Sequence, residues 1–440
     1  MVGITKMKAE KQKAEKEAFF CTTKELSRLG LEQIPTQFQS HKHLIYSSPA
    51  TLAFNSPGAE GFGVKRAGLA VPDSIMLIVA PGCCGRNTSL ISSMKEYNDR
   101  FYYLMMDETD IVTGRHLKKI PKAVEEICSV CPKKPSVVMI CITCVDALLG
   151  TDMERVCKKA EEQVEIPVRP CYMYALTREG RKPPMVHVRQ SLYSLLEPGK
   201  KKGNVVNLLG FFSPLVDDCE IYDLLHSAGV KTIHEISRCK DYMEYQTMSE
   251  ANFNLVLHHE ARFAAEDFHN RLQIPFIELR RLYQIDKIEN QYHALGNALG
   301  VAFYDEKYKK QAEDALEKFR QRCPDASFAI GECLNADPFE LSLALIRYGF
   351  SVPEIYGTIT VENFTYIRSL AKISPETKVF SNMEPTMIYY DPAKSDMNLA
   401  IGKDACYYHP DCPYVMWNGE EQPYGYAGVR RLFEQLLEVV

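Results

Sequence analysis

Two cysteines follow directly after buried apolar strands of the predicted fold. Cys84 lies in the exit loop of the run Ser74–Ala80 (SIMLIVA), and Cys144 lies just past the run Ser136–Ile142 (SVVMICI). Continuous apolar runs of this length are typical of parallel strands that are buried on both faces. Ligands in open parallel sheets bind beyond the carboxyl ends of the strands. The two thiols are therefore expected at one edge of a sheet, within reach of one metal centre, provided that the strands are near neighbours.

The loop around Cys84 (APGCCGRNTS) has features that suit a metal cluster. Gly82 helps to turn the chain, Gly85 lets the backbone approach closely, and Arg86 adds positive charge, although an ordinary surface arginine is the alternative reading. A helix predicted to open near Asn87 would direct free N–H groups and the positive end of its dipole at the loop. Such groups stabilise thiolates and the anionic sulfides of an iron–sulfur cluster.

A zinc ribbon is the main alternative for the cysteines of this region. Cys128-x2-Cys131 and Cys141-x2-Cys144 have the spacing of zinc ligands. However, Cys131 precedes the strand and Cys141 lies near its far end, so the two pairs would be roughly 20 Å apart at ~3.3 Å per residue. A tetrahedral zinc needs all four sulfurs at about 2.3 Å from one ion. The spacing therefore favours structural roles for Cys128 and Cys131, at a helix end.

The composition narrows the class of protein. The net charge of the 440 residues is -5, which argues against a nucleic-acid partner, and no apolar run approaches the roughly 18 residues of a membrane span. No secretion signal is evident, so the 15 cysteines are expected to be reduced in a cytoplasmic protein. Most are expected to be small buried hydrophobes, with metal ligation or an anaerobic habitat explaining their number. The absence of GxxxxGK[ST] predicts no ATP site on this chain.

Apolar strand-like runs alternate with helical patterns along almost the whole chain, which is the α/β signature. We predict three consecutive doubly wound domains with parallel sheets, separated first at the linker-like Pro198–Gly203. The expected domains are an N-terminal helical arm over 1–40, a first domain with the cluster cysteines over 41–200, a second over 201–324, and a third with a C-terminal helix over 325–440. Further strands are expected at Ile166–Arg169, Val205–Phe212, Phe253–His258, Pro275–Leu279, Ser327–Gly331, Pro353–Tyr356 and Lys378–Ser381, and helices at Asp152–Val164, Cys219–Ala228, Ala261–Leu272, Glu306–Arg322, Pro338–Tyr348 and Tyr426–Val440.

Six segments, in unchanged order, resemble the nitrogenase component 1 family. The loop PGCCG resembles the family's cluster loop P-x-G-C-G, and CVDALLGTD resembles its C-P-x-x-L-I-G-D-D segment. Each motif is weak alone, but their joint order covers about residues 50 to 440. The resembling segments are Pro81–Gly85, Asp107–Ile127, Cys144–Asp152, Val206–Val230, Phe253–Leu279 and Tyr424–Leu437.

This resemblance implies a fold, a cofactor and partners. The family has three Rossmann-like domains per subunit, pairs into homo- or hetero-oligomers of component 1-like subunits, and holds an iron–sulfur cluster, expected here as 4Fe–4S. It receives electrons from a dimeric, ATP-dependent iron protein. The resemblance implies a nitrogenase-like oxidoreductase subunit that reduces an unidentified substrate other than dinitrogen. The alternative is a non-catalytic scaffold for metallocluster assembly, and a third possibility is a cluster-free binding protein that kept only the fold.

The sequence departs from the family at the cluster. No cysteine lies between Cys21 and Cys83, so only Cys84 and Cys144 match ligand positions where the family has three. Cys83 is a further candidate ligand, although adjacent cysteines both ligate only where the backbone bends sharply. Cys141 is another, although it is expected within the strand. A partner chain, or the same residues across a twofold axis, is the remaining source of ligands.

The second departure concerns the larger cofactor of true nitrogenases, which a cysteine and a histidine hold. His258 stands where the resemblance places the cysteine, and the histidine position falls near Val415. His258 is therefore a candidate ligand or proton donor, with a structural strand-end histidine as the alternative. Arg115 and His187 are candidates to line the same cavity, with packing or surface roles as the alternative.

Overall fold

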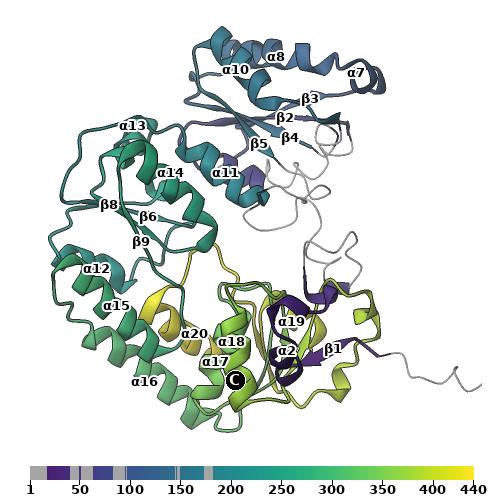
Figure 1. Ribbon diagram of the computed structural model, residues 1–440, viewed down its shortest axis with the longest axis vertical. Coiled ribbons are helices and arrows are strands. Elements are labelled where there is room, and N and C mark those ends of the chain that lie inside the picture. Colours follow the sequence, from purple (N-terminus) through teal and green to yellow (C-terminus); the bar gives the residue numbers. More distant parts are fainter. Residues whose placement is uncertain are drawn as a thin grey trace, which may run out of the picture. The chain divides into compact units, whose positions relative to one another are not determined.

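The computed structural model is an α/β structure built on three sheets (Figure 1). It describes residues 17–39, 49–50, 63–82, 95, 97–143, 145, 149–172 and 182–440. The chain divides into two compact units. One comprises 1–56, 315–418 and 432–440, and the other comprises 57–314 and 419–431. The predicted fold class is confirmed, whereas the predicted boundaries of three domains remain a prediction.

The first sheet has four parallel strands in the order β3-β2-β4-β5. β2 (Ile75–Ala80), β4 (Val138–Ile142) and β5 (Val168–Tyr172) correspond to predicted strands, whereas β3 (Phe101–Met105) was not predicted. β2 pairs directly with β4 over five residue pairs from Ile75↔Val138 to Val79↔Ile142. The two strands that lead to Cys84 and Cys144 are therefore immediate neighbours, and their carboxyl ends share one edge.

Helices cover both faces of this sheet (Figure 1). The core of one face joins alternate strand residues such as Leu77 and Ile140 to α8 (His116–Val130) and α10 (Met153–Val164). The other face joins Met76 and Met139 to α4 (Val64–Gly68) and α11 (Pro184–Tyr193). The short α7 (Glu108–Thr113) precedes α8. Because strand side chains alternate between faces, α8 and α11 lie on opposite sides of the sheet.

The second sheet is also parallel, in the order β7-β6-β8-β9. The strands at its centre, β6 (Val205–Leu209) and β8 (Phe253–Val256), are buried at every position, which explains their continuous apolar runs. α11 packs on α14, and the two helices share one apolar core with both sheets of this unit. The remaining elements are β7 (Thr232–His234), β9 (Phe276–Glu278), α12 (Glu220–Ser227), α13 (Tyr242–Gln246), α14 (Arg262–Leu272), α15 (Ile285–Leu299), η5 (Ile236–Arg238), η6 (Thr247–Glu250) and η7 (His259–Ala261).

The third sheet has six strands in the order β1-β12-β11-β10-β13-β14. Five are parallel, but β1 (Phe20–Thr22) runs antiparallel to β12 (Lys378–Phe380). The described part of the expected helical arm, 17–39, thus begins with a strand. The pairing places the rings of Phe20 and Phe380 5.5 Å apart. The other elements are β10 (Ser327–Ile330), β11 (Ser351–Tyr356), β13 (Leu399–Ile401), β14 (Tyr414–Val415), α2 (Thr23–Leu29), α16 (Glu306–Arg322), α17 (Pro338–Arg347), α18 (Phe364–Ile373), α19 (Lys403–Tyr408), α20 (Gly425–Val439), η2 (Leu31–Gln33), η3 (Thr36–Phe38), η8 (Pro385–Tyr389) and η9 (Pro392–Lys394).

Candidate functional site

The carboxyl edge of the first sheet is the predicted cluster site. Cys83, Cys84, Gly85, Arg86 and Cys144 lie outside the described residues, so their meeting at one metal remains a prediction. The register of β2 and β4 meets the condition on which that prediction depends, because the strands are adjacent. Gly82 is the second residue after β2, and among the described residues a Cβ there would meet the Met105 sulfur at 3.7 Å, an ordinary contact distance.

A buried hydroxyl at this edge has no hydrogen-bond partner among the described residues. Thr143, the first residue after β4, is 1% exposed, and its Oγ1 makes no hydrogen bond with any described residue. A buried hydroxyl without a partner costs about 1 to 3 kcal/mol, so such groups in native structures call for an explanation. A thiolate or sulfide beside Thr143 would accept this hydrogen bond. The residue thus fits an iron–sulfur cluster at the end of β4, and sequence reasoning missed it.

His187 lies near the same edge. Its ring packs edge-on against Tyr172 at 4.3 Å, and Tyr172 ends β5 as the register partner of Ile142. The Nδ1 atom of His187 is 3.3 Å from the Ser191 hydroxyl. Burial, followed by the charge of Lys182, lowers the pKa of His187 to about 4. The ring is therefore neutral at neutral pH and has a lone pair available for hydrogen bonding or ligation.

Cys141 occupies the core rather than the edge. It is 0% exposed within β4, and its register partner on β5 is Cys171. Both belong to the apolar core on the α11 face, and burial raises the pKa of the Cys171 thiol well above its ordinary value. This placement favours a packing role for Cys141 over the ligand role considered from the sequence. Cys131 caps the end of α8, with its sulfur 3.1 Å from the Tyr102 hydroxyl.

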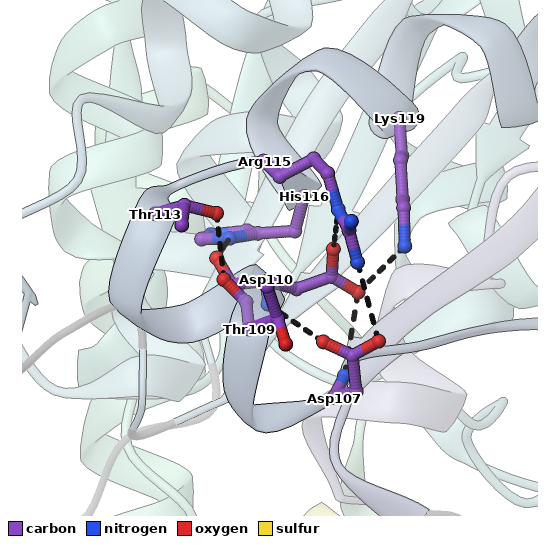
Figure 2. Close-up of polar contacts among 7 residues, drawn as sticks. All are labelled: Asp107, Thr109, Asp110, Thr113, Arg115, His116 and Lys119. Atoms are coloured by element: carbon purple, nitrogen blue, oxygen red, sulfur yellow. Dashed lines mark hydrogen bonds and ion pairs between the residues drawn. The ribbon is translucent and has the colours of Figure 1, made fainter.

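Arg115 belongs to a network at the junction of α7 and α8 (Figure 2). It pairs with Asp110 at 2.6 Å and with Asp107 at 3.3 Å, and Lys119 pairs with Asp110 at 2.6 Å. Asp107 also accepts the Asp110 N–H at 2.7 Å as the cap of α7. These contacts explain Arg115 as a structural residue. The structure does not bring it together with His187, since α8 and α11 lie on opposite faces of the sheet.

The carboxyl edge of the second sheet forms a separate cluster around His258. Gly210 follows β6 and has a φ of +148°. A Cβ at this position would lie 2.8 Å from the backbone nitrogen of His258. The imidazole is stacked on His259 at 4.5 Å and contacts the edge of the Phe211 ring at 5.7 Å. The His258 side chain is 34% exposed, so it is accessible from this edge.

Arg189 fixes this edge to α11. Its Nη2 donates to the Gly210 carbonyl at 2.7 Å, and its Nη1 donates to Met185 O at 2.9 Å and to Glu260 Oε2 at 2.7 Å. Its Cζ lies 4.7 Å from the Phe212 ring centroid. The guanidinium is 5% exposed and is used by these contacts, so Arg189 positions the edge rather than offering a free charge.

Arg281 supplies a second guanidinium, which sequence reasoning also missed. It follows β9, its Cζ lies 4.4 Å from the Phe211 ring centroid, and its Nη2 donates to Gln422 Oε1 at 2.6 Å. Its Nε is buried and makes no hydrogen bond with the described part of the chain. Phe211 therefore contacts both His258 and a guanidinium with one unused N–H.

The electrostatics keep His258 neutral. Burial, followed by the nearby charges of His259, Arg189 and Arg281, holds the pKa of His258 well below its usual value. Its Nδ1 accepts the Glu260 backbone N–H at 3.4 Å, and Glu260 Oε2 lies 3.7 Å from the same atom. The edge therefore presents a neutral imidazole beside a positive charge. Within the described ranges, no group of three or more His, Cys, Asp or Glu residues is arranged to hold a metal ion.

None of the helices in the described part of the chain combines the length and apolarity that a bilayer span requires.

Comparisons with known proteins identify the family. The sequence profile described as "Nitrogenase component 1 type Oxidoreductase" matches residues 60–440. A curated relative, "Nitrogenase iron-molybdenum cofactor biosynthesis protein NifE" of Sinorhizobium fredii, is 25% identical over 418 residues, which cover 89% of this chain and 82% of that protein. A protein of the same name from Clostridium pasteurianum is 24% identical, over 56% of this chain and 54% of its own length.

The fold matches a solved nitrogenase. The structure of "Nitrogenase Cp1 at pH 6.5" superimposes with a TM-score of 0.69 at 18% identity, covering 90% of this chain and 92% of that one. This likeness confirms the α/β fold with parallel sheets. The profile match spans most of the sequence, and the chain therefore belongs to the nitrogenase component 1 type oxidoreductase family.

Proposed function

We propose that this chain is a scaffold on which an anionic metal–sulfur cofactor is assembled. The observation that carries the proposal is the match over 89% of the chain to a relative named for iron–molybdenum cofactor biosynthesis. This favours the assembly alternative over the catalytic reductase that the resemblance first implied. The cargo is proposed to bind at the carboxyl edge of the second sheet, where His258 and Arg281 meet Phe211.

The resident cofactor is proposed to be an iron–sulfur cluster at the edge of the first sheet, held by Cys84 and Cys144. When bound, such a cluster supplies one-electron relay. The orphaned hydroxyl of Thr143 and the neutral ring of His187 support this placement. The remaining ligands are proposed to come from Cys83 or from a component 1-like partner subunit. A dimeric, ATP-dependent iron protein is the proposed electron donor.

A reductase with its own organic substrate is the second candidate. The family description favours it, since the family is named for oxidoreductases. The two candidates predict different outcomes with a partner iron protein and ATP. A scaffold transfers metal to a cofactor-free nitrogenase component 1 protein without consuming a substrate, whereas a reductase turns over a substrate and keeps its metal.

The test of the resident cluster begins with iron and sulfide content after anaerobic purification. Cys84→Ala and Cys144→Ala should each abolish the low-temperature electron paramagnetic resonance signal of the dithionite-reduced protein. Cys157→Ala is the matched control, because Cys157 is 2% exposed in the core of the same sheet and should leave the signal intact. Full iron content in the Cys84→Ala, Cys144→Ala double variant would overturn the assignment.

The test of the scaffold function is a transfer assay. Protein loaded with ⁵⁵Fe-labelled cofactor precursor is mixed with cofactor-free nitrogenase component 1, separated again, and the label is counted on each protein. Movement of label together with gain of nitrogenase activity supports the scaffold. Retention of label together with ATP-dependent substrate reduction supports the reductase instead.

A further inference from the structure

The hydrogen bonding of His258 determines which of its two ring nitrogens carries the proton. Nδ1 accepts the backbone N–H of Glu260 at 3.4 Å, in the turn that leads into α14. An atom that accepts an N–H does not carry a proton itself, and a neutral imidazole carries one proton. The proton of His258 is therefore on Nε2. A nitrogen that carries a proton donates a hydrogen bond and cannot ligate a metal without losing that proton.

The other charged groups at this edge favour an anion. Arg281 has a buried Nε–H without a partner in the described chain, next to the Phe211 ring that His258 also contacts. Glu260, whose carboxylate lies near His258, is paired with Arg189 at 2.7 Å. His259 is the remaining titratable neighbour. The edge thus places the N–H of a neutral imidazole and the cationic guanidinium of Arg281 next to the same aromatic ring.

We propose that His258 binds the cargo as a hydrogen-bond donor through Nε2–H, with the Arg281 guanidinium as the second donor, and that His258 is not a metal ligand. The proposal rests on the assembly function for the identity of the cargo, an anion whose sulfide atoms accept the two hydrogen bonds. It assigns Glu260 as a positioning residue, because its backbone N–H fixes the proton on Nε2. The opposite tautomer would place Nδ1–H toward Glu260 Oε2, 3.7 Å away, and leave Nε2 free to ligate.

The first experiment needs no cargo. The full-length protein, labelled with ¹⁵N at its 11 histidines, is measured by long-range ¹H–¹⁵N correlation at pH 7, and the His258 signals are assigned by their loss in His258→Gln. The expected pattern is that of a neutral ring protonated on Nε2. A ring protonated on Nδ1, or a doubly protonated ring, would overturn the proposal. This result does not depend on metal transfer, so it separates failure of the inference from failure of the scaffold function.

The second experiment titrates the same labelled protein with tetrathiomolybdate, an anion with sulfide acceptors, and separately with Zn²⁺. Tetrathiomolybdate should shift the His258 Nε2 signal, and Arg281→Gln should weaken its binding at least about tenfold, the lower end for a hydrogen bond to a charged group. Arg280→Gln is the matched control, because Arg280 is exposed, carries the same charge and precedes Arg281. It should weaken binding less than about twofold, since exposed charges interact weakly.

The opposite set of results identifies a metal ligand. Zn²⁺ would then move the Nε2 signal to a metal-bound position, and Arg281→Gln would strengthen that binding by removing a positive charge. Arg281→Lys is a second variant in case Arg281→Gln does not fold. It keeps the positive charge but loses the planar set of N–H donors. Equal tetrathiomolybdate binding by wild type, Arg281→Gln and Arg281→Lys would overturn the role of Arg281.

Discussion

Gly210 is a residue whose lack of a side chain allows the carboxyl ends of β6 and β8 to meet. Its φ of +148° is unfavourable for other residues, and a Cβ would lie 2.8 Å from the backbone nitrogen of His258. We predict that Gly210→Ala lowers the free energy of unfolding by about 2 to 4 kcal/mol, from backbone strain and overlap together. Urea unfolding followed by circular dichroism measures this change.

The control for Gly210 is Gly203→Ala. A Cβ on Gly203 meets nothing within 4 Å, so this variant should stay within about 0.5 kcal/mol of wild type. If the two variants unfold at the same urea concentration, the close approach at Gly210 does not stabilise the edge.

The ion pairs of Asp110 should make the stability of the folded protein depend on pH. Hydrogen bonds from Lys119 and then Arg115 hold the pKa of the Asp110 carboxyl well below its usual value. A carboxyl group with a lowered folded-state pKa contributes stability that is present above the unfolded-state pKa and is lost as pH falls toward the folded-state value. The difference in the free energy of unfolding between wild type and Asp110→Asn should therefore be largest at pH 7 and should shrink below about pH 4. Urea unfolding at pH 7, 4 and 3 tests this, with exposed Asp314→Asn as the control.

At the residue scale, the sequence located part of the candidate site. His258 was found because it follows an apolar strand and occupies a position implied by the family resemblance. Arg281 was not found, because nothing in the sequence separates it from exposed Arg280 one position earlier. Only the folded edge shows that Arg281 contacts Phe211. Arg115 pairs with Asp110 and Asp107, five and eight residues earlier, so its contacts at the helix junction give it a structural role, and its role in lining a cavity stays a prediction.

At the scale of elements, the long buried strands were predictable, as were the short β9 and β12, whereas β3 and β1 were not. β2 and β4 are continuous apolar runs because both faces of the sheet are covered. β3 was missed because it lies at the sheet edge, where its five residues are all partly or fully exposed. β1 was missed because its three residues become a strand only by pairing with β12, more than 350 residues away in sequence. Such pairing leaves no local signal.

The N-terminus of α20 is capped by a carboxylate from another helix. Glu220, from the start of α12, is 1% exposed and accepts the backbone N–H groups of Tyr426 at 2.6 Å and Ala427 at 3.0 Å, as well as the Tyr292 hydroxyl at 2.6 Å. Gly425 leaves room for this carboxylate, since a Cβ there would lie within 1.9 Å of Glu220 Oε1. The side chain therefore acts as a cap for a helix that is distant in sequence.

We predict that Glu220→Ala destabilises the protein by about 3 kcal/mol or more, because three buried donors lose their acceptor. Amide hydrogen exchange of the first turn of α20 should accelerate. Glu438→Ala, at an exposed position near the other end of α20, should leave that exchange unchanged. Unaltered protection of the first turn in Glu220→Ala would show that water or another group replaces the carboxylate.

At the scale of the whole molecule, seven cysteines form a class whose thiol pKa is raised by burial. Burial raises the pKa of Cys21 to about 11 and those of Cys239 and Cys406 to about 12. Thiols with raised pKa remain protonated at pH 8 and alkylate slowly. The further members of this protected class are Cys157, Cys171, Cys219 and Cys333. Part of the excess of cysteines in the sequence is thus a feature of the core, where six of them are buried.

Alkylation mapping of all 15 cysteines tests the assignment of Cys84 and Cys144 as cluster ligands. Iodoacetamide at pH 8, followed by peptide mass spectrometry, is applied to anaerobically purified protein before and after removal of iron by a chelator. We predict that Cys84 and Cys144 become reactive only after iron removal, since a thiolate bound to iron cannot attack the reagent. The seven thiols with raised pKa should stay slow in both states, which makes them an internal control for unfolding. If Cys84 and Cys144 react equally in both states while the seven remain protected, iron is held elsewhere, and the edge of the first sheet is not its site.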